Sequence, residues 1–445
     1  MHDCRLHLSP ASAISLYLCV TGVKKGLFTI ITDVWVLALK TKKANWPNDN
    51  NQMQITLNRR LPKITAVAAT PVSVPTSRPC AWSRGSGFGF TRTVVELTTD
   101  DGLIGFGECE GSAAAVAIKE WLGKQLIGRS INDFAFVART CQADFRDYGC
   151  LSDVTTVKAY AAIEMALWDL MGKHCELPVY QLLGGAVREA AEFSAYGYSI
   201  HLKTAGIQES EVPNAMAAHA VQSIKPSGAR TYEFKIGRFS EQTDIETIRA
   251  VRHAVGDDVI LAADANQALN IDQARKIFRN VKTSRLDWCE EPVAAFDDMV
   301  RLNHEFHVPL STHCVDPEKL RFYPEIEGVV GDLHLQGGIR GILRAASGIA
   351  TLGRRFWQRA SLELGISWAA MVHVGISCPD INRASQSLID YVEDDLIEGP
   401  KWQLTNGGVV PANRPGLGVE LDRAALQKYS ELFKEKGEWT YFDGE

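Results

Sequence analysis

The sequence lacks the features that mark several large classes of protein. Its ten cysteines include no CxxC pair and follow no regular spacing, so neither a zinc site nor a disulfide framework is indicated. No long basic tract accompanies the net charge of -6, which argues against nucleic acid or an anionic membrane as a partner. No apolar run reaches the roughly 20 residues that a helix needs to span a bilayer. What remains is the composition of a soluble globular protein, whose free thiols suit the cytoplasm.

The first 60 residues differ from the rest of the 445-residue chain. Lys24 and Lys25 split two short apolar segments, and a polar, linker-like stretch follows at 43–54. Arg5 precedes a short apolar run as in a secretory signal, but no convincing small-residue cleavage site comes after it. We therefore interpret residues 1–60 as an extension outside the fold, either disordered or the result of a misassigned start.

Residues 61–190 are predicted to form a domain with both strands and helices. The runs at 63–74 and 91–110 have the character of β-strands, and the second contains an Asp-Asp-Gly sequence that fits a hairpin turn. The Gly-, Ser- and Pro-rich segment 77–90 between them is expected to be a flexible loop. In that loop Arg84 could contact an anionic ligand, and a surface loop without a role is the alternative. Helical periodicity dominates 112–174, and the C-terminal segment 410–445 is expected to complete this domain.

Residues 191–409 repeat a pattern of one short apolar run followed by one amphipathic segment. Each of six runs ends in a residue suited to chemistry, and the steps between these residues are 29, 26, 23, 19 and 27. A step of this length has room for a strand, a loop and a helix, which predicts right-handed βαβ units around a parallel sheet that closes into a barrel. The loops after the strands of such a barrel share one face. The residues expected to converge there are Lys235, Asp264, Glu290, His313, Asp332 and Arg359.

The residue types at these strand ends indicate a particular chemistry. Carboxylates on neighbouring strands, with a third ligand on the next strand, would hold a hard divalent cation such as Mg²⁺. Lys235 on the preceding strand suggests a base that takes a proton from the carbon beside a substrate carboxylate, with the cation stabilising the resulting enediolate. Alternatively, Lys235 only pairs with Glu233 or Asp264. Strand alternation places Asn266 on the same face as Asp264.

From residue 62 onward the chain resembles the enolase superfamily, in its mandelate racemase and glucarate dehydratase branch. The motifs that carry the resemblance are TDDGLIGFGE, AAIEMALWDLMGK, LPVYQLLGG, FKIG, DANQAL, CEEP, ELGIS and RPGLGVELD. It implies an α/β fold, a modified (β/α)7β-type TIM barrel with an α+β N-terminal capping domain, and substrate held between the two. It also implies a homo-oligomer.

The resemblance assigns roles to individual residues. Lys235 matches the second lysine of a Lys-x-Lys strand, whose first position is Glu233 here. Asp264 and Glu290 match two metal ligands, and Asn266 matches an asparagine that contacts substrate. The third ligand of the glucarate branch is an asparagine where this chain has His313. Because imidazole prefers softer ions than Mg²⁺, another divalent ion remains open.

A further departure lies at the position of the family's catalytic histidine. Asp332 matches the aspartate of a His-Asp dyad, but the histidine position is Arg359. Arginine stays protonated and cannot act as a general base, although it could pair with Asp332 and hold a substrate carboxylate. Racemisation, which needs a base on both faces of the carbon, is therefore not expected. Tyr198 and Arg84 are the remaining candidates for contact with substrate.

Two functions follow from these expectations. The first is a metal-dependent acid-sugar dehydratase, a hydro-lyase of carbohydrate acid catabolism similar to glucarate dehydratase. The second is a relative that binds metal and a small-molecule acid sugar without turning it over, because the dyad histidine is replaced.

Overall fold

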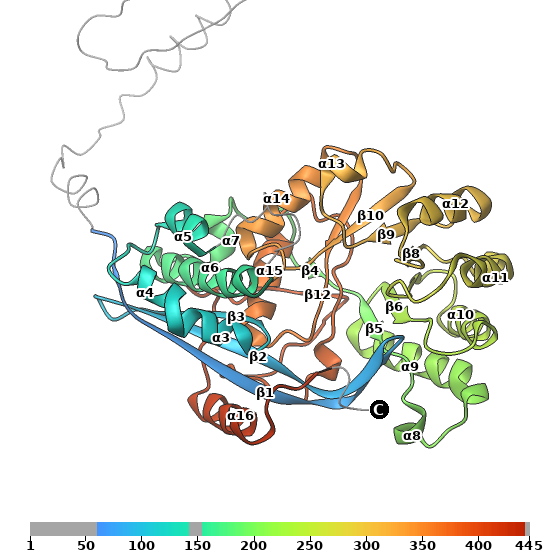
Figure 1. Cartoon of the computed structure of the whole chain (residues 1–445), viewed down its shortest axis with the longest axis horizontal. Helices are drawn as coiled ribbons and strands as arrows, with labels where there is room; N and C mark the ends of the chain where they lie inside the picture. The colour runs from blue at the N-terminus through green and yellow to red at the C-terminus, as the bar shows by residue number, and fades with distance from the viewer. Residues whose placement is uncertain (1–59, 142–153, 441–445) are drawn as a thin grey trace, which may run out of the picture. The chain divides into compact units, whose positions relative to one another are not determined.

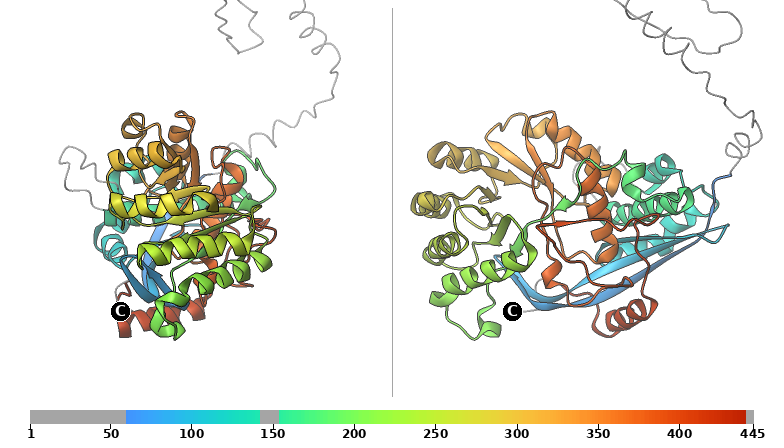
Figure 2. Two further views of the ribbon diagram at one scale, coloured as in Figure 1. Left: turned by 90° about the vertical axis from the view of Figure 1, so that its right-hand side faces the viewer. Right: turned by 180° about the vertical axis from the view of Figure 1, so that it is seen from behind.

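The computed structural model describes residues 60–141 and 154–440, and Leu61–Glu445 form one compact unit. Figures 1 and 2 show the strands and helices of this unit from three sides. Apart from Arg60, the extension predicted at residues 1–60 lies outside the described residues.

Three antiparallel strands form the N-terminal sheet. They are β1 (Ile64–Trp82), β2 (Gly85–Thr99) and β3 (Ile104–Glu110). As predicted, a tight turn links β2 to β3, and Gly102 occupies it with φ of 90°, a conformation that favours glycine.

The predicted flexible loop at 77–90 is wrong. Strands β1 and β2 continue through this segment and stay paired down to Trp82 and Gly85, after a register shift between Pro75 and Cys80. The glycines of this segment predicted a loop. In the structure Gly89 instead permits close packing, because a side chain at this position would overlap the ring of Trp439.

Helices cover this sheet on one side. They are α3 (Ala113–Ala117), the π-helix η1 (Ile118–Leu122), α4 (Gly123–Leu126), α5 (Phe134–Cys141) and α6 (Val154–Cys175), with the short α7 (Val179–Leu182) after them. The C-terminal helix α16 (Arg423–Lys436) packs on β1, and its Arg423 pairs with Glu96 of the neighbouring β2 at 2.6 Å. Helix α16 therefore lies against the N-terminal sheet.

The barrel sheet contains seven parallel strands in the order β11-β10-β9-β8-β7-β6-β5. Their bounds are β5 (Ala195–Gly197), β6 (Thr231–Lys235), β7 (Ile260–Asp264), β8 (Trp288–Glu290), β9 (Leu310–Thr312), β10 (Ile326–Gly331) and β11 (Arg355–Gln358). A separate antiparallel pair joins β4 (Ala191–Glu192) to β12 (Gly408–Val409).

The segment at 385–386 links the two edges of the parallel sheet. Gln386 donates its backbone N–H to the carbonyl of Gln358 at 2.8 Å, on the β11 side. On the opposite side, the N–H of Ser385 bonds to Glu192 at 2.9 Å and the N–H of Ser194 bonds to Ser385 at 2.8 Å. This segment occupies the place of an eighth strand, which brings the side chain of Gln386 into the barrel.

Helices alternate with the strands and cover their outer side. The longer ones are α9 (Val212–Ser227), α10 (Glu241–Val255), α11 (Ile271–Val281), α12 (Phe296–Phe306), α14 (Ile339–Ala350) and α15 (Gly365–Ser377). Shorter ones are α8 (Leu202–Ala205), η3 (Glu209–Glu211), η4 (Lys282–Ser284), α13 (Pro317–Leu320) and η5 (Ile389–Tyr391). In the left view of Figure 2 the helices coloured green to yellow, α9 to α12, lie side by side over the strands.

Helix α11 shows how the sequence specifies these elements. Its buried positions Ala274, Ile277, Phe278 and Val281 have the spacing of one helix face, which packs inward. Asn270 begins the helix, because its side chain accepts hydrogen bonds from the first turn in a capping box.

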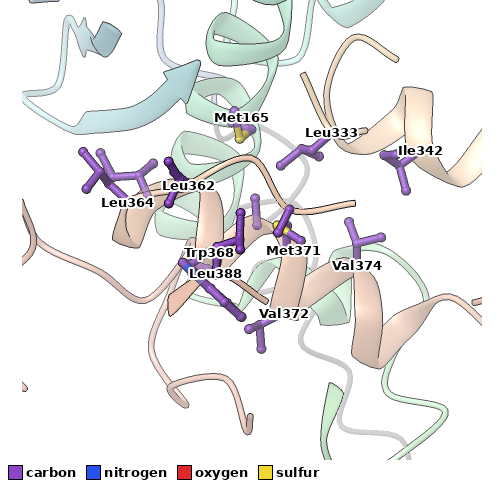
Figure 3. Close-up of a cluster of buried hydrophobic side chains, with 14 of the residues drawn as sticks. Met165, Leu333, Ile342, Leu362, Leu364, Trp368, Met371, Val372, Val374 and Leu388 are labelled. Atoms are coloured by element: carbon purple, nitrogen blue, oxygen red, sulfur yellow. The ribbon is translucent and has the colours of Figure 1, made fainter. Parts of the chain in front are cut away.

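One hydrophobic cluster is shared by the capping domain and the barrel. Figure 3 shows Met165 of α6 close to Leu362, Trp368 and Met371, which lie on and before α15. Burial of apolar side chains from both parts stabilises their packing against each other.

Two buried carboxylates of the capping domain also bind the starts of barrel helices. Glu164 accepts the backbone N–H groups of Ile339 at 2.8 Å and Arg340 at 3.0 Å, the first residues of α14. Glu108 accepts those of Leu364 at 2.9 Å and Ser367 at 3.0 Å, at the start of α15. The N-cap residue of neither helix supplies a side-chain hydrogen bond, so these carboxylates perform the capping.

Among the described residues, no helix combines the length and apolar character required to cross a membrane.

Candidate active site

The predicted chemistry-bearing residues lie at successive carboxyl ends of the barrel strands. Lys235, Asp264 and Glu290 end β6, β7 and β8 and stand beside one another in register. His313, Asp332 and Arg359 directly follow β9, β10 and β11. Because the strands are parallel, their carboxyl ends share one face of the barrel.

Lys235 is enclosed by aromatic rings. Its Nζ atom lies 5.4 Å from the ring of Tyr196, 5.8 Å from that of Trp82 and 5.9 Å from that of Tyr198. The same atom lies 2.5 Å from Oδ2 of Asp264, and the lysine side chain is only 11% exposed. The ion pair between Lys235 and Asp264, which the sequence analysis left as an alternative, is thus present. The ammonium also lies at the carboxyl end of β6, which is the face of the barrel mouth.

Asp264 is held by several donors. The Tyr196 hydroxyl donates to Oδ2 at 3.2 Å, while Asn266 donates its backbone N–H to Oδ1 at 2.8 Å and its side-chain amide to Oδ2 at 3.2 Å. Asn266 adopts a φ of 48°, in the left-handed region that asparagine tolerates. Its Oδ1 atom is buried and has no hydrogen-bond partner among the described residues. The predicted substrate-binding asparagine therefore has a free acceptor.

Three buried carboxylates gather below the mouth. Glu233, Asp264 and Glu290 each offer an oxygen, and these oxygens lie within 4.8 Å of one another. The amide of Gln386 donates to Oε1 of Glu233 at 2.7 Å and to Oε2 of Glu290 at 3.0 Å. Buried carboxylates at this separation repel unless a proton or a cation lies between them.

His313 reaches this cluster. Its Nε2 atom lies 2.9 Å from Oε1 of Glu290, but the two atoms are not aligned as a hydrogen bond, and Oε1 has no hydrogen-bond partner among the described residues. Its Nδ1 atom lies 3.4 Å from the carbonyl oxygen of Val330. The backbone N–H of His313 is fixed by Glu291, whose Oε1 accepts it at 3.0 Å.

The pKa values of the cluster reflect its crowding. Burial, followed by repulsion from Glu290 and Asp264, raises the pKa of Glu233 well above its usual value. Burial and Asp264 likewise raise the pKa of Glu290. Burial also raises that of Asp264, but Lys235 outweighs it and the pKa is lowered overall. Burial lowers the pKa of His313, yet Glu290 outweighs this and brings it to about 8.

Arg359 directly follows β11 and pairs with Asp332, which follows the neighbouring strand β10. Its Nη1 atom lies 3.1 Å from Oδ2 of Asp332, and its side chain is 27% exposed. The other carboxylate oxygen of Asp332 accepts the backbone N–H groups of His334 and Leu335, each at 2.8 Å. Burial raises the pKa of Asp332, but Arg359 outweighs it and lowers the value to about 2. Asp332 is thus an ionised anchor for Arg359, the pairing anticipated from the sequence.

The hairpin tip of the capping domain lies on the barrel loops. Arg84 donates to the backbone oxygen of Asn266 at 3.2 and 3.3 Å, and Ser83 donates to that of Ala265 at 3.2 Å. Arg238 in turn donates to the carbonyl of Trp82 at 2.8 Å. Arg84, predicted to bind substrate, is engaged in holding this contact instead of lining the carboxylate cluster.

Tyr198, the other predicted substrate contact, does border the site. It is 6% exposed, and its ring packs edge-on against that of Tyr391 at 5.0 Å. The Tyr391 hydroxyl accepts the backbone N–H of Tyr198 at 2.8 Å.

Sequence reasoning assigned no role to Gln386, and it named Trp82 only as a residue of the 77–90 loop that could contact an anionic ligand. Both side chains reach the site. Trp82 lay in a segment interpreted as loop. Gln386 lies outside any recognisable strand pattern, so no signal marked it. Glu233 could have been found, because strand alternation places it on the face of Lys235.

The fold and these strand ends bring a buried cluster of three carboxylates, a lysine and an arginine to the mouth of one barrel. Residues 64–184 match the family model described as mandelate racemase / muconate lactonizing enzyme, N-terminal domain, and residues 215–425 match enolase C-terminal domain-like. The chain belongs to the enolase superfamily, in its mandelate racemase and muconate lactonizing branch. The predicted recognition and fold class are confirmed.

Similar proteins differ in the reaction for which they are named. The chain is 28% identical over 391 residues to a protein from Streptomyces coelicolor named probable glucarate dehydratase, covering 82% of this chain and 90% of that one. It is also 28% identical over 395 residues to an N-succinyl-L-Arg/Lys racemase from Bacillus cereus, covering 82% and 97%. The family is therefore certain, and the specific reaction is a matter for proposal.

A solved structure of a relative bears on the metal. An enolase from Pseudomonas fluorescens with bound magnesium, potassium and tartrate superposes with a TM-score of 0.77 at 26% identity, covering 86% of this chain and 96% of the other. Here the buried acidic cluster and the unpartnered Oε1 of Glu290 fit a divalent cation.

Proposed function

We propose that the protein is a metal-dependent acid-sugar dehydratase that removes the α-proton of a carboxylate substrate and then releases water. The observation that carries the proposal is the asymmetry of the mouth, with Lys235 on one side and Arg359 on the other. A lysine can serve as a base, whereas a guanidinium cannot. Two relatives named for the dehydration of acid sugars, glucarate and arabinonate, support this choice.

Lys235 would take the α-proton. Its Nζ is held by Asp264 and by three aromatic rings, which keep water away from it. To act as a base, it must first give up the proton that it shares with Asp264. Asp264, Glu290 and His313 are the residues that would hold a divalent cation, whose positive charge stabilises the anion left by proton removal.

Arg359 would bind the anionic end of the substrate. Its guanidinium is anchored at one nitrogen by Asp332 and remains partly exposed at the mouth. Guanidinium presents paired N–H groups that match a carboxylate. The acceptor Oδ1 of Asn266 is available for a hydroxyl of the substrate. Departure of hydroxide on the second step would be assisted by water or another group.

The test is solvent deuterium exchange and product formation across a panel of acid sugars with Mg²⁺ or Mn²⁺ present. At least one substrate should exchange its α-proton and lose water, and Lys235→Ala should abolish both. Exchange that persists in Lys235→Ala would refute the role of this lysine.

A second candidate is a protein that binds metal and an acid sugar without turnover. It is favoured by the ion pair between Lys235 and Asp264 and by arginine at position 359. Saturable binding with no exchange for any substrate would support this candidate over the dehydratase.

A further inference from the structure

The segment 360–364 directly follows Arg359 and leads from β11 into α15. At its centre Leu362 has a φ of 62°, in the left-handed region that leucine rarely adopts. The Leu362 side chain is fully buried in the cluster shared by the capping domain and the barrel (Figure 3). A residue in such a conformation keeps it only where its surroundings fix the backbone.

Arg92 of β2, in the capping domain, supplies part of that fixation. Its side chain is buried, and its Nε atom donates to the carbonyl oxygen of Leu362 at 3.0 Å. Its Nη2 atom donates to the carbonyl oxygen of Ser361 and, at 3.4 Å, to the Ser361 hydroxyl. One planar guanidinium thus holds two consecutive carbonyls, which the single ammonium of a lysine does not reproduce.

The backbone N–H groups of the segment are held as well. Ala360 donates to Oε1 of Gln386 at 3.3 Å, and Ser361 donates to Oε1 of Glu363 at 2.6 Å. Leu364 donates to Glu108 at 2.9 Å. With Arg92 on the carbonyls, the course of the chain from Arg359 to α15 is set by side chains and not by a regular ladder of hydrogen bonds.

Arg92 is itself held between two buried carboxylates. Its Nε atom lies 3.7 Å from Oε1 of Glu108. Burial raises the pKa of Glu108 to about 7 and also raises that of Glu363, and in both cases Arg92 is the strongest influence in the opposite direction. Because a buried cation is costly unless it is paired and hydrogen-bonded, these carboxylates keep the guanidinium in place under the segment.

The segment in turn bears on the substrate-binding arginine of the proposed function. The backbone N–H of Arg359 bonds to the carbonyl of Gly331 at 2.8 Å, which fixes the residue on the side of β10. On its other side the chain continues directly into the segment that Arg92 holds. The guanidinium of Arg359 reaches Asp332 at 3.1 Å from this backbone position.

We propose that Arg92 is a positioning residue for Arg359: by binding the carbonyls of Ser361 and Leu362 it fixes the backbone from which Arg359 reaches the anionic end of the substrate. The inference rests on the role of Arg359 in the proposed function. It deepens that function by making anion binding depend on a buried arginine of the capping domain.

The first experiment needs no ligand. Hydrogen–deuterium exchange of the full chain is followed by mass spectrometry on peptides that contain 359–364. Arg92→Lys keeps the charge beside Glu108 but loses the paired donors, so exchange in this segment should become about tenfold faster. Arg92→Gln, a second variant that cannot hold both carbonyls, should have the same effect.

The second experiment is a double-mutant cycle on glucarate binding, measured by calorimetry with Mg²⁺ present. Arg92→Lys should weaken binding by about tenfold when Arg359 is present. In the Arg359→Ala background the same change should have little effect, because there is no guanidinium left to position. A merely structural role for Arg92 would weaken binding equally in both backgrounds.

Arg252 provides a matched control. It is a buried arginine of α10 that donates to the backbone carbonyls of Ser284, Gly256 and Val259 at 2.7 to 2.9 Å. Arg252→Lys should lower the melting temperature but leave glucarate binding and exchange at 359–364 unchanged. Melting temperatures show that each variant is folded.

The outcomes are distinct. Unchanged exchange at 359–364 in the Arg92 variants, or equal weakening of glucarate binding in both backgrounds, would overturn the inference and leave the dehydratase proposal intact. Absence of glucarate binding by wild type would count against the proposed function, and the exchange rates would then decide the inference.

Discussion

Replacing Lys235 by methionine should make the protein bind its divalent cation more tightly. In the structure the ammonium of Lys235 lies 2.5 Å from Oδ2 of Asp264, and Asp264 is one of the three carboxylates that would hold the ion. An incoming cation must therefore displace the ammonium or share its carboxylate with it. Methionine keeps most of the length of the side chain and its contacts with the aromatic rings but carries no charge.

The size of the effect follows from the contact that is lost. A hydrogen bond to a charged group contributes about 1.5 to 3 kcal/mol, and this contribution opposes the ion only in the wild type. Since 1.4 kcal/mol is a factor of ten in affinity, Lys235→Met should lower the dissociation constant by about ten- to 150-fold. Calorimetric titration with Mg²⁺ or Mn²⁺ at constant ionic strength measures the change directly.

The chain supplies a matched control for this experiment. Lys173 pairs with buried Asp169 at 2.8 Å and lies 4.3 Å from the ring of Phe106, in the capping domain. Lys173→Met removes the same kind of contact away from the barrel mouth and should leave ion affinity unchanged. Equal or weaker binding by Lys235→Met, relative to wild type, would refute the idea that the ammonium competes with the ion.

Three further outcomes are expected. Asp264→Ala and Glu290→Ala should each abolish the rise in melting temperature caused by divalent ions. If both variants keep the full rise, neither carboxylate binds the ion. Arg359→Ala should weaken binding of an anionic substrate by about 1.5 to 3 kcal/mol while exchange at saturating substrate persists; loss of exchange with intact metal binding would contradict its binding role. Burial raises the pKa of Glu164 from 4.5 to about 7, so the folded state binds more protons between these values and stability falls as pH rises through them. Glu164→Gln should reduce that slope by about one proton in denaturant titrations from pH 4 to 8, and an unchanged slope would argue against this group as its source.

The barrel and its mouth were predictable because spacing and alternation carry the information. A regular succession of strand, loop and helix predicts parallel strands, and parallel strands bring their ends to one face. The sequence alone therefore predicts that Lys235, Asp264 and Glu290 lie close together. Asn266 also lies beside Asp264, where a hydrogen bond of 3.2 Å joins their side chains, but it does so in the left-handed conformation beyond the end of β7 and not through strand alternation.

Other features depend on tertiary contacts that leave no local pattern. The segment 77–90 carries loop-forming residues, but pairing across the hairpin and packing against Trp439 make it strand. Gln386 enters the barrel from a segment with little regular structure, held by backbone bonds to both sheet edges. The engagement of Arg84 with the carbonyl of Asn266 depends on how the hairpin tip meets the barrel. The positions of these residues depend on contacts in the folded protein. Secondary-structure propensity and hydrophobic periodicity do not predict them.

The capping of α14 and α15 by Glu164 and Glu108 bears on how the molecule unfolds. Separating the capping domain from the barrel would uncover two helix starts, remove the acceptors of four backbone N–H groups and expose the shared cluster around Met165. Neither part can open alone without these losses, so the two should melt in one cooperative transition. Substitutions at the hairpin tip can then change substrate specificity without disturbing this interface. A capping domain exchanged between relatives, in contrast, must carry both Glu164 and Glu108 to cap the two barrel helices.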